Sequence, residues 1–135
     1  MSASSLSPIA ACALVACGGA VGSVARYALG LAVGAITGTT SAYPWAILGI
    51  NILGSLAMGL LFGWLARHDG GTETMRLLLG VGMLGGFTTF SAFSLEIILL
   101  IQREAFGLAA LYVGSSVIGG IIALYAGLIL MGETA

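Results

Sequence analysis

Polar side chains inside long apolar runs are the residues of this sequence whose chemistry suits binding or moving a solute. Such groups are costly in lipid and by default mark an ion or substrate path. Asn51 is followed by Ser55, Gly59 and Gly63 at four-residue steps, which places a small, partly polar stripe on one helix face. The stripe predicts either a helix-packing seam with one buried amide or amide donors that face an ion path.

A second polar cluster, GGFTTFSAFS over residues 85–94, lies in the middle of another apolar run. Two glycines followed by two threonines make a poor helix interior, so we expect the helix to break there. A break frees backbone carbonyl and N–H groups, which a membrane tolerates only where they line a cavity or hold an ion.

Side chains of the same cluster add anion-binding chemistry. Phe90 and Phe93 stand three residues apart, and the edges of their rings carry partial positive charge that can line an anion path. A simple apolar core would be the ordinary interpretation of two such rings, but the break and the hydroxyls beside them favour the anion path. The hydroxyl-bearing residues of the cluster are Thr88, Thr89, Ser91 and Ser94.

Two further sets of residues are candidates. Tyr112 and Ser116 lie one turn apart on a shared face, although a tyrosine of an interfacial belt remains the alternative for Tyr112. Arg26 and Glu96 are the charges inside apolar runs. Arg26 either gathers anions at a vestibule or extends to the interface, and Glu96 is expected to be partnered or protonated.

No enzyme constellation is apparent. The single histidine, His68, falls in a loop, which excludes a histidine metal cluster or a catalytic triad. The glycine-rich run at residues 18–22 lies within a helical segment with no preceding strand, so it is not a nucleotide-binding loop. A net charge of −1 gives no indication of nucleic-acid binding.

Composition places these residues in a membrane. Of 135 residues, 59% are hydrophobic and only 7% are charged, against roughly 25% charged in soluble domains. A spanning helix needs about 20 apolar residues. The sequence therefore predicts an all-α integral membrane protein, one domain over residues 1–135, with four transmembrane helices and the third broken mid-membrane. The expected helices cover about 8–34, 44–66, 76–102 and 106–131.

The arginines give little information about how the chain is oriented in the membrane. Four helices place Arg67 and Arg76 on one side of the membrane and Arg103 and Arg26 on the other. Two against two provides no clear positive-inside bias. The chain is therefore expected either to insert both ways round, which permits an antiparallel dimer, or to be oriented by one anchor.

Three sequence segments together resemble the CrcB/Fluc fluoride channel family. They are the GSVARY sequence that contains Arg26, the YPW sequence that leads to Asn51, and the cluster at residues 85–94. The resemblance covers nearly the whole chain and all four helices in order. It implies a passive fluoride-selective channel that lowers cytoplasmic fluoride. It also implies a multi-pass protein of the cell (inner or plasma) membrane that assembles as an antiparallel, dual-topology homodimer.

The resemblance also assigns roles to residues. A structural sodium ion at the dimer centre would be held by the backbone carbonyls of Gly85 and Thr88. Arg26 and Glu96 would match the family's helix-one arginine and helix-three glutamate. The fluoride pathway would be lined by Asn51, Phe90, Phe93, Ser91, Thr89, Tyr112 and Ser116.

This chain also departs from the family pattern. Ile47 stands where a threonine is frequent, and Gly120 stands where a further serine is expected, which thins the hydroxyl track. Phe87 replaces a more common aliphatic residue.

Two other functions compete with fluoride conduction. A proton-coupled small multidrug transporter needs a carboxylate in helix one, which this chain lacks, and a non-transporting scaffold would leave the polar cluster unexplained.

Overall fold

The structure, a computed structural model, describes residues 6–38, 41–68 and 72–132, and these are helical apart from their connections. Four elements are long and apolar enough to cross a membrane, which confirms the prediction of four spanning helices. The third of them, Glu73–Gln102, is composed of several consecutive pieces. The elements are α1 (Pro8–Thr37), α2 (Trp45–Arg67), α3 (Glu73–Met75), η1 (Arg76–Leu84), α4 (Gly85–Phe87), α5 (Phe90–Gln102) and α6 (Phe106–Leu130).

The helix ends differ slightly from those expected. α1 continues to Thr37, three residues beyond the expected end, and the third element begins at Glu73 rather than at 76. The earlier start has a local cause, because the Thr72 hydroxyl accepts a hydrogen bond from the Met75 N–H at 3.3 Å and caps the first turn. Pro44 lies just before α2 instead of inside its first turn.

The third element is irregular along most of its length. Residues Arg76–Leu84 form a π-helix, and the Gly85 N–H donates to the Gly80 carbonyl five residues earlier. Thr88 (φ −78°, ψ 160°) and Thr89 (φ −152°, ψ 122°) are then extended, between α4 and α5. α5 resumes with Thr89 as its N-cap, since the Thr89 hydroxyl accepts from the Ala92 N–H at 3.2 Å. The π-helix was not anticipated from the sequence.

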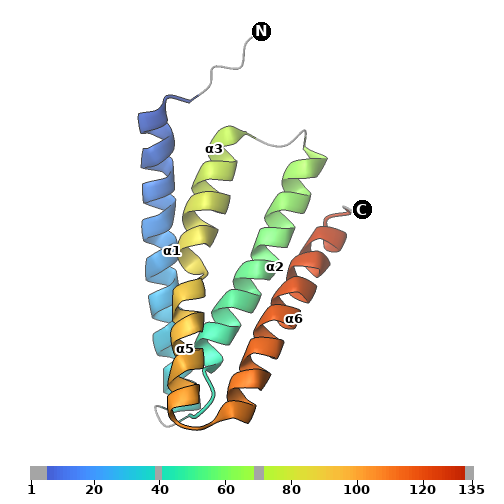
Figure 1. Ribbon diagram of the computed structural model, residues 1–135. Helices are drawn as coiled ribbons and strands as arrows, with labels where there is room; N and C mark the ends of the chain where they lie inside the picture. Colours follow the sequence, from blue (N-terminus) through green and yellow to red (C-terminus); the bar gives the residue numbers. More distant parts are fainter. Residues whose placement is uncertain (1–5, 39–40, 69–71, 133–135) are drawn as a thin grey trace.

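The helices pack as two pairs, α1 with η1 and α4, and α2 with α6. The two pairs converge where α1 ends and α6 begins, and they diverge toward the other end of the bundle (Figure 1). Glycines set the close approach within both pairs. A Cβ on Gly22 of α1 would collide with the Met83 carbonyl, and one on Gly59 of α2 would collide with the Leu124 carbonyl of α6.

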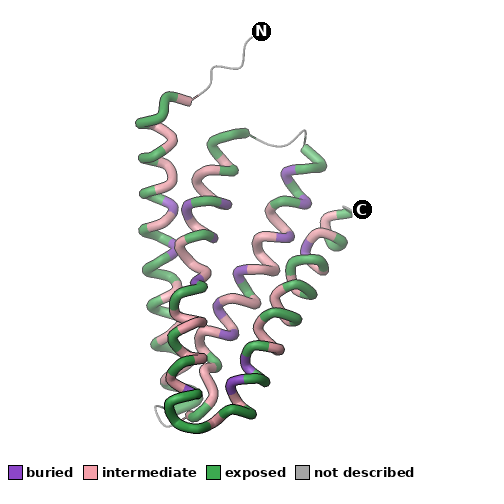
Figure 2. Tube along the Cα trace, viewed as in Figure 1, coloured by how far each residue is buried: buried purple, intermediate pink, exposed green. Residues whose placement is uncertain are grey.

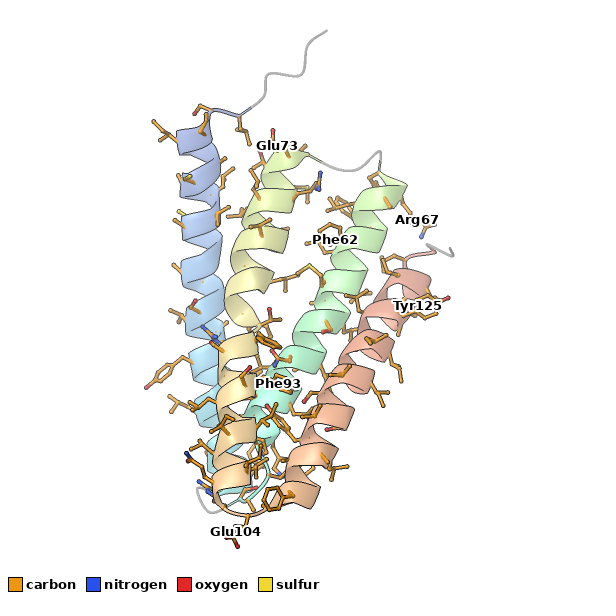
Figure 3. All side chains as sticks on the ribbon, viewed as in Figure 1. Phe62, Arg67, Glu73, Phe93, Glu104 and Tyr125 are labelled. Carbon is orange, nitrogen blue, oxygen red and sulfur yellow. The ribbon has the colours of Figure 1, made fainter. Side chains whose placement is uncertain are left out.

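Burial is limited to the facing sides of the helices, while most of the outer surface is exposed or half-buried (Figure 2). Large apolar side chains cover that outer surface, for example Tyr27 of α1, Leu95 of α5 and Ile121 of α6. Three charged residues lie at the ends of the bundle, Arg67 and Glu73 at one end and Glu104 at the other (Figure 3). This distribution is that of a bundle whose solvent is lipid.

Candidate functional site: a groove beside two extended threonines

An open groove of about 360 Å³ lies beside the extended residues of the third element. Three helices and the extended segment contribute to its wall. α2 supplies its amide and one hydroxyl, α5 supplies two phenyl rings, and α6 supplies a second hydroxyl. The lining residues that matter here are Asn51, Ser55, Thr88, Thr89, Phe90, Phe93 and Ser116.

The polar stripe of α2 divides between two roles. Asn51 and Ser55 line the groove, whereas Gly59 and Gly63 pack against α6. The helix-packing interpretation therefore holds for Gly59 and Gly63, while the ion-path interpretation of Asn51 stays a prediction. Gly54, between the two polar residues, has no room for a larger side chain, because a Cβ there would collide with the Thr88 side chain. That close contact brings α2 against the extended segment.

Asn51 binds the backbone of Thr89 with both ends of its amide. Its Nδ2 donates to the Thr89 carbonyl at 3.0 Å, and its Oδ1 accepts from the Thr89 N–H at 2.9 Å. Only this amide orientation satisfies both bonds, since a carbonyl cannot donate and an N–H cannot accept. The Asn51 side chain thus pairs with Thr89 as a second peptide group would. The other N–H of its amide, called the reserve N–H below, makes no hydrogen bond to any described residue.

Two backbone carbonyls lack their α-helical partners where Thr88 and Thr89 are extended. In a continuous α-helix the Gly85 carbonyl would accept from the Thr89 N–H, and the Thr88 carbonyl would accept from the Ala92 N–H. The Thr89 N–H donates instead to Asn51, and the Ala92 N–H donates instead to the Thr89 hydroxyl. Backbone carbonyls without partners at membrane depth need another electropositive group.

A row of aromatic rings leads from the groove into the bundle. Phe90 is 79% exposed on the surface of the single chain. Its ring centroid lies 5.7 Å from that of Phe93, which in turn lies 5.3 Å from the ring of Tyr112. Phe93 projects from α5 into the interior between the helices (Figure 3). The ring of Tyr43 closes the row, edge-on to Tyr112 at 5.8 Å and 90°.

Four hydroxyls lie at the inner end of this row. The Ser115 hydroxyl donates to the Tyr112 carbonyl at 3.2 Å, so the Tyr43 hydroxyl must donate to Ser115, 2.6 Å away. The Tyr112 and Ser116 hydroxyl oxygens are buried and make no hydrogen bond to any described residue. Since buried polar groups normally have partners, this pair is available to a small polar or anionic solute.

The structure brings five of the seven expected pathway residues to the groove wall: Asn51, Thr89, Phe90, Phe93 and Ser116. Two do not line it. Tyr112 is fully buried behind Phe93, which also argues against an exposed interfacial tyrosine, and Ser91 is exposed, with its hydroxyl 3.3 Å from that of Thr89. Arg26 and Glu96 are half-buried and lie outside the groove wall.

Sequence reasoning missed other residues of the site. Met58 contributes an apolar part of the groove wall, and Gly54 lines the groove as well. The hydrogen bond between Tyr43 and Ser115 joins residues 72 positions apart, and no local sequence pattern indicates this contact. A tyrosine directly before a proline at a helix start was the only available signal.

Comparison with known proteins decides the family. The sequence model of the family described as CrcB-like protein, Camphor Resistance (CrcB), matches residues 13–128. The chain belongs to the CrcB family. The resemblance predicted from the GSVARY, YPW and helix-three segments is thereby confirmed.

Curated relatives in the CrcB family cover almost the same length. A protein of Novosphingobium aromaticivorans named fluoride-specific ion channel FluC is 55% identical over 90% of this chain and 95% of its own length. Proteins of the same name from Sphingopyxis alaskensis (55% identical, 84% of this chain, 89% of its own) and Caulobacter vibrioides (53%, 86% and 91%) are similar. This CrcB family member is a multi-pass protein of the cell membrane and is not an enzyme.

Proposed function

We propose that this chain is a fluoride channel that conducts the ion passively and lowers the concentration of fluoride in the cytoplasm. The observation that carries the proposal is the identity of 55% over 90% of the chain to a protein named fluoride-specific ion channel FluC. The groove supports it, because amide, hydroxyl and ring-edge groups converge there without a carboxylate. Fluoride is small and strongly hydrated, so it needs several such donors in succession.

In this proposal each group of the groove contributes to moving the anion. The reserve N–H of Asn51 and the hydroxyls of Ser55 and Ser116 replace water around the ion. The ring edges of Phe90 and Phe93 attract the anion weakly, which favours conduction, since an ion held too tightly does not leave. The buried Tyr112 and Ser116 hydroxyls extend this path inward, with Ser91 and Thr89 beside its outer end.

The working unit in this proposal is an antiparallel homodimer of chains inserted in both orientations. The balanced arginines permit dual insertion. Phe90, although it lies next to the interruption near the middle of the third element, is 79% exposed on one chain, and Gly85 is exposed as well. A second copy would cover both residues and would enclose the open side of the groove.

Sodium would be the structural ion at the dimer centre, where the third helix of each chain is interrupted at mid-membrane depth. The fit rests on the carbonyls of Gly85 and Thr88, whose helical donors are used elsewhere. Backbone carbonyls at an unwound helix suit a hard monovalent cation. One chain offers two such carbonyls, and an antiparallel copy would double them. The bound cation would supply fixed positive charge close to the anion path.

The test is fluoride efflux from liposomes containing the purified protein, followed with a fluoride electrode and with chloride efflux as the comparison. Wild-type protein should release fluoride much faster than chloride, and Ser116→Ala should slow that release. Thr37→Ala, at the end of α1 and away from the groove, is the matched control and should leave it unchanged. Fluoride retention like that of empty liposomes would refute conduction, and equal rates for both anions would refute selectivity.

Neither alternative function gains support. A proton-coupled multidrug transporter needs a membrane carboxylate in its first helix, and α1 contains no aspartate or glutamate. A scaffold needs close helix packing, which the glycine seams supply, but it has no use for two buried hydroxyls without partners.

A further inference from the structure

The extended segment of the third helix depends on one side chain of another helix. Thr89 has two backbone groups that would continue the helix, and both are bound by the Asn51 amide of α2 at 2.9 and 3.0 Å. Thr89 itself is 8% exposed, so solvent offers no comparable substitute. The interruption is therefore maintained from α2 and not by residues 85–91 alone.

The contact between Asn51 and Thr89 determines whether the Gly85 carbonyl, which Asn51 does not touch, accepts a helical hydrogen bond. By taking the Thr89 N–H, the Oδ1 of Asn51 leaves the Gly85 carbonyl without its helical donor. If the amide were absent, that N–H would be buried and unsatisfied, and the Gly85 carbonyl would be its helical acceptor. A carbonyl that accepts such a bond directs its lone pair along the helix and is a poorer cation ligand.

We infer that Asn51 is a positioning residue for the cation site as well as a lining residue of the anion groove. One amide thereby links the two: Oδ1 frees a carbonyl for the cation, and Nδ2 presents its second N–H to the groove. The inference rests on the sodium part of the proposed function. It assigns to Asn51 an effect on sodium affinity, a property that a purely anion-lining residue would not influence.

Thr89 provides an independent variant with the same logic. Its hydroxyl binds the Ala92 N–H, whose acceptor in a continuous helix would be the Thr88 carbonyl, and a valine of similar shape would release that N–H. Thr89→Val should therefore also weaken sodium binding, while the two backbone bonds to Asn51 remain. This variant keeps the inference testable if Asn51→Leu fails to fold.

The experiment measures thermal protection of the purified, full-length protein by sodium. Sodium chloride replaces N-methylglucamine chloride at constant ionic strength, and the sodium concentration giving half of the maximal rise in melting temperature is recorded. Asn51→Leu and Thr89→Val should each raise that midpoint at least about tenfold, because each releases an N–H whose helical acceptor is a carbonyl ligand. Ser116→Ala lines the same groove but makes no contact with the freed carbonyls, so its midpoint should equal that of the wild type.

The outcomes distinguish a failure of the inference about Asn51 from a failure of the sodium proposal. A wild-type midpoint in both Asn51→Leu and Thr89→Val, even with a lowered melting temperature, would overturn the inference and leave the sodium proposal standing. A wild-type protein without sodium protection would overturn both. Fluoride efflux of the wild type at saturating sodium reports separately on conduction.

Discussion

A Cβ on Gly22 tests whether the packing of α1 against the third element is as close as the structure indicates. That atom would collide with the Met83 carbonyl oxygen and would lie 2.8 Å from the Phe87 backbone nitrogen. Both obstacles are backbone atoms, so no side-chain rotation can make room, and α1 must move away from η1 and α4. Overpacking costs about 1–3 kcal/mol, and this rigid site should reach about 3 kcal/mol for Gly22→Ala.

The same substitution elsewhere on α1 provides the matched control. A Cβ on Gly30 would meet nothing within 4 Å, so Gly30→Ala should be neutral or stabilise the helix by up to about 1 kcal/mol. The assay is equilibrium unfolding in mixed micelles of increasing denaturing detergent, followed by the fluorescence of Trp45 and Trp64. Free energies of unfolding within about 1 kcal/mol of each other for Gly22→Ala and Gly30→Ala would refute the close packing.

Two further predictions concern the row of aromatic rings. Phe90→Ile and Phe93→Ile should each reduce fluoride efflux severalfold without dissociating the assembly, because they remove ring edges but retain apolar volume. Phe106→Ile, on an exposed ring at the start of α6, is the control. Wild-type efflux in both groove variants would show that the rings are only core. Tyr43→Phe should lower the free energy of unfolding by about 1 kcal/mol through loss of its hydrogen bond to Ser115, whereas Tyr27→Phe on the exposed face of α1 should not. Equal free energies of unfolding for the two variants would mean that this hydrogen bond contributes nothing to stability.

The architecture could be predicted from the sequence because membrane insertion depends on properties that are local in the chain. A run of about 20 apolar residues is enough to specify a spanning helix, so the four spans follow from composition. Residues 85–94 carried enough glycine and threonine to predict an irregular backbone there, and Thr88 and Thr89 are extended. The start of the third element was misplaced, since Thr72 caps a turn that is not yet apolar.

The site depended on contacts between helices that no local pattern specifies. Four-residue spacing placed Asn51 and Ser55 on one face but did not reveal that the Asn51 amide would bind the Thr89 peptide. The sequence likewise grouped Tyr112 with the pathway but did not reveal that its ring lies fully buried behind Phe93.

Sequence alone therefore determined that this protein spans a membrane four times and to which family it is similar, and it predicted an irregular backbone in the third helix. Only the tertiary structure decided which polar groups are used up and which remain available. The physical reason is that each donor or acceptor can make only a few hydrogen bonds, and residues distant in sequence decide which partner takes them. Asn51 and Thr89 are 38 residues apart, and their contact leaves the Gly85 carbonyl without its helical donor.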